Sequence, residues 1–163
     1  MNIIVRKYTR DDVPDMIEIW NAVVNEGIAF PQDEPLTFDS GILFFNSQSY
    51  CGVAADKDTD KIYGLYILHP NNIGRCGHIS NASYAVCPNM RGKHIGRSLV
   101  LDSIEKGKEL GFGVLQFNAV VETNAAARHL YESLGFVQLG TIPNGFKTKD
   151  GHFENICPYY HTL

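Results

Sequence analysis

A strand, a helix and a second strand follow one another with short connections in the middle of the sequence. Residues 78–86 have the pattern of a strand, 92–110 carry a helical pattern that stops at Gly111, and 114–121 favour a strand again. Two such strands joined through a helix need a parallel pairing with a right-handed crossover. This unit predicts an α/β fold with helices packed on a sheet.

The flanking segments predict further strands that are mostly antiparallel. Residues 2–8 form a β-rich opening, and 49–55 and 62–69 read as the two strands of a hairpin. Two more strands are expected near 136–142 and 152–157. The predicted fold is a single-domain, mixed sheet with a central parallel pair and helices on both faces.

Three further helices are expected. The first begins at the capping sequence Thr9–Asp12, with Pro14 in its first turn. Its apolar side chains recur at helical spacing, at Val13, Met16, Ile17, Trp20, Val23 and Val24. Residues 27–40 are rich in Pro, Gly and Asp and break this helix, and a short helix is expected at 39–47. Asn124 caps the last one.

Composition narrows the class of protein. A length of 163 residues with 44% hydrophobic and 20% charged residues is typical of one globular domain. The net charge of −4 argues against nucleic acid or an acidic membrane as partners. Charged residues near the start and the lack of a long apolar run argue against a signal peptide or membrane span, so a cytoplasmic location is expected.

The cysteines form no C-x-x-C pair, and the histidines have no zinc-ligand spacing. We therefore expect no metal and four free, mostly buried thiols in a reducing compartment. These cysteines are Cys51, Cys76, Cys87 and Cys157.

The segment that joins the strand at 78–86 to the following helix has the features of an anion site. Gly92 and Gly96 allow a ligand to approach the main chain closely, and the first turn of the helix offers unpaired N–H groups. Cationic side chains surround it, at Arg91, Lys93, His94 and Arg97. The pattern is neither a Walker loop nor a dinucleotide fingerprint. It suits a pyrophosphate, although a basic helix start on the surface would have a similar sequence.

At this point the sequence resembles the GNAT acetyltransferase superfamily. Arg91–Gly96 matches the family pattern (Q/R)-x-x-G-x-(G/A) at its first and last positions, while His94 stands where the fourth position has glycine. Asn124–Phe136 matches a second family segment, N-x-x-A-x-x-x-Y-x-x-x-G-F. The resemblance implies an N-acetyltransferase that uses acetyl-CoA and no metal, acts on a small-molecule amine and adopts the GNAT fold. Homodimers are common in this superfamily.

Within the superfamily the sequence is also similar to the acetyltransferases of proline analogues such as azetidine-2-carboxylate. The shared features are Gly27–Pro31, Asn81–Ser83, and the spacing from Asn118 to Thr123-Asn124. This resemblance implies that Asn81 and Asn118 belong to the acceptor site. An amide is no base, so these residues would position the acceptor rather than remove a proton from it.

The GNAT resemblance also implies which residues hold the cofactor. The main chain of Tyr84, Ala85 and Val86 would pair with the pantetheine arm, and the Val86 N–H would stabilise the developing oxyanion. Asn124 would contact the cofactor, a role compatible with capping its helix. The pyrophosphate would be held by Arg91 and by the loop residues Gly92, Lys93, His94, Ile95, Gly96 and Arg97.

Tyr131 matches the family tyrosine near the thiol sulfur, which implies a general acid for the departing thiolate. It shares an apolar helix face with Ala127, Leu130 and Leu134, so spacing alone favours a core tyrosine, and the family motif is what favours catalysis.

Two predicted inner strands carry polar residues where buried strands are usually apolar. Asn81 and Ser83 share one strand face, and Gln116 and Asn118 share another. Burying such amides without partners costs a few kcal/mol. They therefore either satisfy one another or line a polar acceptor pocket.

The sequence leaves the general base open, with Glu26, His78 and Glu122 as candidates beside water-mediated deprotonation. The loop 26–36 lies where the family closes its acceptor site, so Phe30 and Pro31 would form an apolar wall there, or simply pack inward. Two other functions stay open, a non-catalytic acyl-CoA sensor and an acetyltransferase that acts on a protein or peptide amine.

Overall fold

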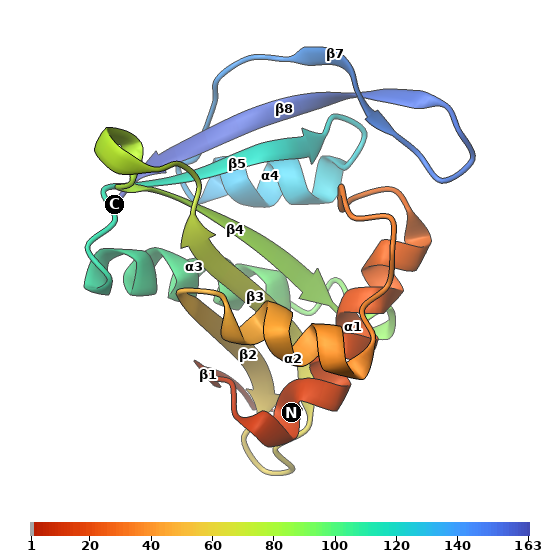
Figure 1. Cartoon of the computed structure of the whole chain (residues 1–163), viewed down its shortest axis with the longest axis vertical. Helices are drawn as coiled ribbons and strands as arrows, with labels where there is room; N and C mark the ends of the chain where they lie inside the picture. Colours follow the sequence, from red (N-terminus) through yellow and green to blue (C-terminus); the bar gives the residue numbers. More distant parts are fainter. Residues whose placement is uncertain (1) are drawn as a thin grey trace.

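The computed structural model describes residues 2–163, and one twisted sheet runs through the molecule with helices on both faces (Figure 1). The strands are β1 (Ile3–Lys7), β2 (Tyr50–Asp56), β3 (Ile62–Pro70), β4 (Ile79–Val86), β5 (Val114–Val121), β6 (Val137–Gln138), β7 (Ile142–Lys147) and β8 (Phe153–Thr162). Their order in the sheet is β1-β2-β3-β4-β5-β8-β6, and β7 pairs with β8. β4 and β5 are parallel, whereas the other neighbours run antiparallel. The predicted mixed sheet with a central parallel pair is confirmed.

Within residues 2–163, four α-helices lie on the two faces of the sheet: α1 (Val13–Glu26), α2 (Phe38–Asn46), α3 (Ile95–Glu109) and α4 (Ala125–Ser133). Short 3-10 turns are η1 (Arg10–Asp12), η2 (Gly74–Cys76) and η3 (Pro88–Met90). The apolar side chains of α1 and α2 form one core with β2, β3 and β4. Those of α3 and α4 form a second core on the opposite face. Side chains of β4 therefore alternate between two different environments.

The first core is centred on Trp20, which is 1% exposed. Its ring centroid lies 4.4 Å from that of Phe30 and 5.1 Å from that of Phe44. Phe30 belongs to the segment between α1 and α2, so its contact with Trp20 holds that segment against α1. The predicted inward packing of Phe30 is thus present, and it also fixes one wall of the cleft described below.

The C-terminal strands differ from the prediction. Instead of one strand at 136–142, the chain forms the two-residue β6, turns, and continues as β7. The turn follows from Gln138, whose Nε2 donates to the carbonyl of Gly140 and to the Thr141 hydroxyl. β8 is longer than the predicted 152–157 because it pairs with β5, β6 and β7 in succession.

The four cysteines are free thiols, with Cys51 and Cys157 buried and Cys76 exposed. Burial raises the pKa of the Cys51 thiol to about 12. Between residues 2 and 163, every helix falls short of the length and apolar character needed to cross a membrane.

Candidate active site

A cleft of about 2280 Å³ opens where β4 and β5 separate. The two strands pair only from Ile79 to Asn81 and from Val114 to Gln116. Beyond these residues both strands continue without pairing to each other, and the cleft enters the space between them. It extends from the start of α3 to the turn between β7 and β8. The parting of two parallel strands thus creates an unpaired strand edge inside the molecule.

The main chain of β4 presents two residues to this cleft. The N–H of Cys87 donates to the carbonyl of Tyr63 on β3. Since successive main-chain groups of a strand point to opposite edges, the N–H groups of Val86 and Tyr84 point away from β3, toward the cleft. Ala85 has the opposite orientation, is 1% exposed and does not line the cleft. The geometry thus favours Tyr84 and Val86 as main-chain ligands and leaves Ala85 out.

The loop before α3 brings most of the predicted anion-binding residues to one end of the cleft. The residues that line it there are Arg91, Gly92, His94, Ile95, Gly96 and Arg97. Lys93 does not line the cleft, and its ammonium contacts the Met90 sulfur at 3.4 Å. α3 begins at Ile95, three residues later than predicted. The first N–H groups of a helix have no partner within it, and those of α3 lie at this end of the cleft.

His94 explains this late start. It is the N-cap of α3 and has a left-handed main chain, with φ 63° and ψ 7°. The family pattern has glycine here, and glycine is the residue that adopts this conformation without steric cost. Histidine is among the few other residues that tolerate it. The departure from the family pattern therefore preserves the backbone of the loop.

Two substitutions test this conformation. His94→Gly should change the free energy of unfolding by no more than about 1 kcal/mol, because relieved strain is offset by a more flexible unfolded chain. His94→Val should lower it by about 1–2 kcal/mol, because a β-branched residue fits a left-handed position poorly. Urea denaturation measures both values. Equal stabilities of the two variants would contradict a left-handed residue at this position.

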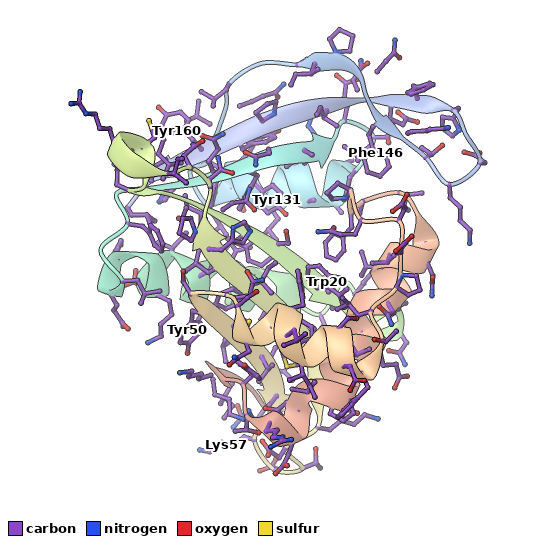
Figure 2. All side chains as sticks on the ribbon, in the orientation of Figure 1. Trp20, Tyr50, Lys57, Tyr131, Phe146 and Tyr160 are labelled. Atoms are coloured by element: carbon purple, nitrogen blue, oxygen red, sulfur yellow. The ribbon has the colours of Figure 1, made fainter. Side chains whose placement is uncertain are left out.

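Tyr131 lies on α4, is half-buried, and stands beside the parting strands (Figure 2). Its ring centroid is 4.5 Å from that of Phe117 on β5 and 6.3 Å from that of Tyr84 on β4. Within residues 2–163 its hydroxyl has no hydrogen-bond partner, and burial raises its pKa. The phenol is therefore protonated near neutral pH and free to donate to a group that enters the cleft.

Asn124 caps α4 as predicted, since its side-chain oxygen accepts from the N–H of Ala127 at 3.2 Å. The same residue lines the cleft. Its Nδ2 is thus the part of the side chain that remains available to a ligand.

The polar residues of β4 and β5 are hydrogen-bonded within the protein, and several of them also line the cleft. Asn81 donates from Nδ2 to the carbonyl of Gln116 at 3.0 Å, across the parallel pair. Gln116 donates to the Oδ1 of Asn118, whose Nδ2 donates to Asn71 at 2.6 Å. Asn81, Ser83 and Asn118 also line the cleft, on the face covered by α1. Asn81 and Asn118 therefore make hydrogen bonds within the protein and also line the cleft, whereas Gln116 does not line it.

The three candidate bases separate in space. Glu26 lines the cleft, where its Oε2 lies 2.9 Å from the Nη2 of Arg91. His78 precedes β4 at the opposite end of that strand and does not line the cleft. Glu122 also lies outside it, and its carboxylate accepts from Asn155. Of the three candidates, Glu26 is therefore the one that lines the cleft.

The turn between β7 and β8 was not predicted as part of the site. It lines the far end of the cleft with Thr148, Lys149, Asp150, His152 and Glu154. The sequence signal was the Asp150-Gly151 pair, a common hairpin turn. It was missed because the preceding Pro143-Asn144-Gly145 has the composition of a loop rather than of a strand.

The side chains of this turn are tied together. His152 lies 2.7 Å from the Oδ1 of Asp150 and 3.1 Å from the Oε1 of Glu154, and these carboxylates raise its pKa. Across the described part of the chain, no three His, Cys, Asp or Glu side chains are arranged to hold a metal ion.

Residues 14–136 match the model of the acetyltransferase (GNAT) family. The chain is 33% identical over 102 residues to the N-acetyltransferase aca1 of Schizosaccharomyces pombe, a match that covers 61% of this chain and 49% of that protein. The chain thus spans about half the length of this curated relative. It is 25% identical over 142 residues to the L-amino acid N-acyltransferase MnaT of Escherichia coli, which covers 85% of this chain and 82% of that one.

Solved structures agree with this match. A GCN5-related N-acetyltransferase from Kribbella flavida has a TM-score of 0.91 at 31% identity, with 99% of this chain and 98% of that chain covered. The yncA structure from Salmonella typhimurium, solved with acetyl-CoA, has a TM-score of 0.92 at 21% identity, with 100% and 95% covered, and supports the fold. Because the model of this family matches residues 14–136, three quarters of the sequence, the chain belongs to the GNAT acetyltransferase family.

Proposed function

We propose that the protein transfers an acetyl group from acetyl-CoA to the amine of a small molecule, with an amino acid or a proline analogue such as azetidine-2-carboxylate as the favoured acceptor class. The observation that carries this proposal is the cleft between β4 and β5, which joins an anion site at one end to a polar, aromatic-walled pocket at the other. The 25% identity to an L-amino acid N-acyltransferase supports the choice of acceptor class.

The residues of the cleft fit this cofactor. The α3 N-terminus and Arg91 would hold the diphosphate, and the main chain of Tyr84 and Val86 would pair with the pantetheine arm. The cofactor supplies the activated thioester, and the Val86 N–H would donate to the carbonyl oxygen as negative charge develops on it. Asn124 would add a side-chain contact.

In the proposed reaction the acceptor nitrogen attacks the thioester carbonyl carbon, and the carbon–sulfur bond breaks. The Tyr131 hydroxyl donates its proton to the departing thiolate, and the acceptor amine loses one proton to water or to a base such as Glu26. Asn81, Asn118 and Phe30 would orient the acceptor, which lowers the barrier by holding the two reactants in place.

The test is calorimetry with acetyl-CoA, followed by thiol release with a panel of azetidine-2-carboxylate, proline, other amino acids, phosphinothricin, spermidine and a basic peptide. Binding and turnover with a small amine are expected. Turnover with the peptide alone would favour the protein-modifying alternative, and binding without turnover would favour a sensor.

Asn118→Ala tests the acceptor pocket. We expect kcat/KM for the fastest acceptor of that panel to fall about tenfold, or about 1.4 kcal/mol, while acetyl-CoA affinity is unchanged. Asn71→Ala is the matched control, because it removes the same Asn118–Asn71 hydrogen bond from outside the cleft. Equal kinetic losses in both variants would assign Asn118 to sheet stability rather than to acceptor binding.

A further inference from the structure

One ion pair connects the two ends of the proposed site. Arg91 Nη2 lies 2.9 Å from Glu26 Oε2, and both residues line the cleft. Glu26 is the last residue of α1, and the carbonyl of the next residue, Gly27, accepts from the N–H of Lys149 in the β7–β8 turn. Arg91 opens the loop that leads into α3, on the proposed diphosphate side. The pair thus forms a bridge between two segments 65 residues apart in the sequence.

The position of Glu26 explains why Arg91 is drawn to it. The C-terminus of a helix carries a partial negative charge, and a carboxylate there is unfavourable. α1 has no basic residue in its own last turn, so it supplies no counter-charge within the helix. The guanidinium of Arg91 comes from another segment and supplies this counter-charge to the Glu26 carboxylate.

The ion pair between Arg91 and Glu26 is weaker than the interaction that Arg91 could make with a diphosphate. The side chains of Arg91 and Glu26 are 46% and 28% exposed, and a single hydrogen bond joins them. An ion pair this exposed contributes at most about a five-fold factor to an equilibrium. A diphosphate beside Arg91 would carry more charge than one carboxylate and would also gain the N–H groups of α3.

We infer that Glu26 and the diphosphate of the cofactor compete for Arg91, so that cofactor binding breaks the bridge and leaves the Glu26 carboxylate free in the acceptor half of the cleft. This inference rests on the proposed function, because it requires a diphosphate ligand at α3. It gives Glu26 an influence on cofactor affinity without direct contact, acting through Arg91.

The test is a double-mutant cycle on the dissociation constant of acetyl-CoA, measured by calorimetry at low ionic strength. Glu26→Gln should tighten binding about two- to five-fold, because the competing carboxylate is lost. Arg91→Met should weaken binding. In the Arg91→Met background, Glu26→Gln should change the dissociation constant by less than 1.5-fold (about 0.2 kcal/mol).

Glu105→Gln is the matched control, since it removes the same charge and breaks the exposed pair between Glu105 and Lys108 on α3 outside the cleft. It should leave acetyl-CoA affinity unchanged. Weaker or unchanged acetyl-CoA binding by Glu26→Gln would overturn the inference. So would an equal gain in affinity with and without Arg91, because that would indicate simple repulsion between the Glu26 carboxylate and the diphosphate. If the unaltered protein binds acetyl-CoA but the variants show none of these changes in affinity, the inference fails and the proposed function stands. If the unaltered protein does not bind acetyl-CoA, the proposed function and the inference both fail.

Discussion

Replacing Tyr131 with phenylalanine should lower kcat by about 100-fold or more if its hydroxyl protonates the departing thiolate. The ring would keep its contacts with Phe117 and Tyr84, so acetyl-CoA affinity should change little. Steady-state thiol release and calorimetry measure the two effects separately. The structure adds a second expectation, since this hydroxyl has no partner among residues 2–163 and removing it costs the fold no hydrogen bond.

Tyr131→Phe should therefore be at least as stable as the unaltered protein in thermal unfolding. Tyr160→Phe is the control, a tyrosine on β8 that does not line the cleft (Figure 2). Loss of activity without loss of stability would mark Tyr131 as part of the reaction. An unchanged kcat would remove that role, and a loss of stability with unchanged kcat would identify a core tyrosine.

Trp20→Ala should destabilise the protein by about 3–5 kcal/mol, the usual cost of removing a large buried aromatic side chain. Trp20 is 1% exposed and packs against Phe30, Phe44 and Phe45, so the cavity has little chance to collapse. At roughly 2–4 °C per kcal/mol for a chain of this size, Tm should fall by about 6–20 °C.

Leu43→Ala is the control for this prediction, because Leu43 is on α2 and 71% exposed. Its Tm should change by less than about 2 °C, in keeping with the small effect of surface substitutions. Calorimetry of both variants is sufficient. A loss below 1 kcal/mol in Trp20→Ala would contradict the central place of Trp20 in the core of α1 and α2.

The elements of the fold that could be predicted are those with a strong local pattern. The helix 13–26 has a capping sequence and an apolar face, and the unit from 78 to 121 has turn residues at both junctions. β7 lacked such a pattern. Its Pro143-Asn144-Gly145 interrupts the alternation, and Asn144 has φ 55°, so pairing with β8 alone makes it a strand.

The residues of the cleft also fall into those that the sequence could predict and those that it could not. Residues in short sequence motifs, such as Gly96 or Tyr131, could be located through their resemblance to a family. The side chains of the β7–β8 turn could not, because they reach the cleft only through long-range packing. Which candidate base lines the cleft was equally undecided, since Glu26, His78 and Glu122 differ in tertiary position rather than in local sequence.

The contact between Gly27 and Lys149 has a consequence for how this cleft could be remodelled. The N–H of Lys149 donates to the carbonyl of Gly27 at 3.1 Å, and its ammonium donates to that of Asn25 at 3.0 Å. A side chain at position 27, where φ is 66°, would collide with Lys149. The two turns at the proposed acceptor end of the cleft come from opposite ends of the chain and pack directly against each other. Loop grafts that seek a new acceptor preference must therefore exchange both turns together, and insertions in one need compensating changes in the other.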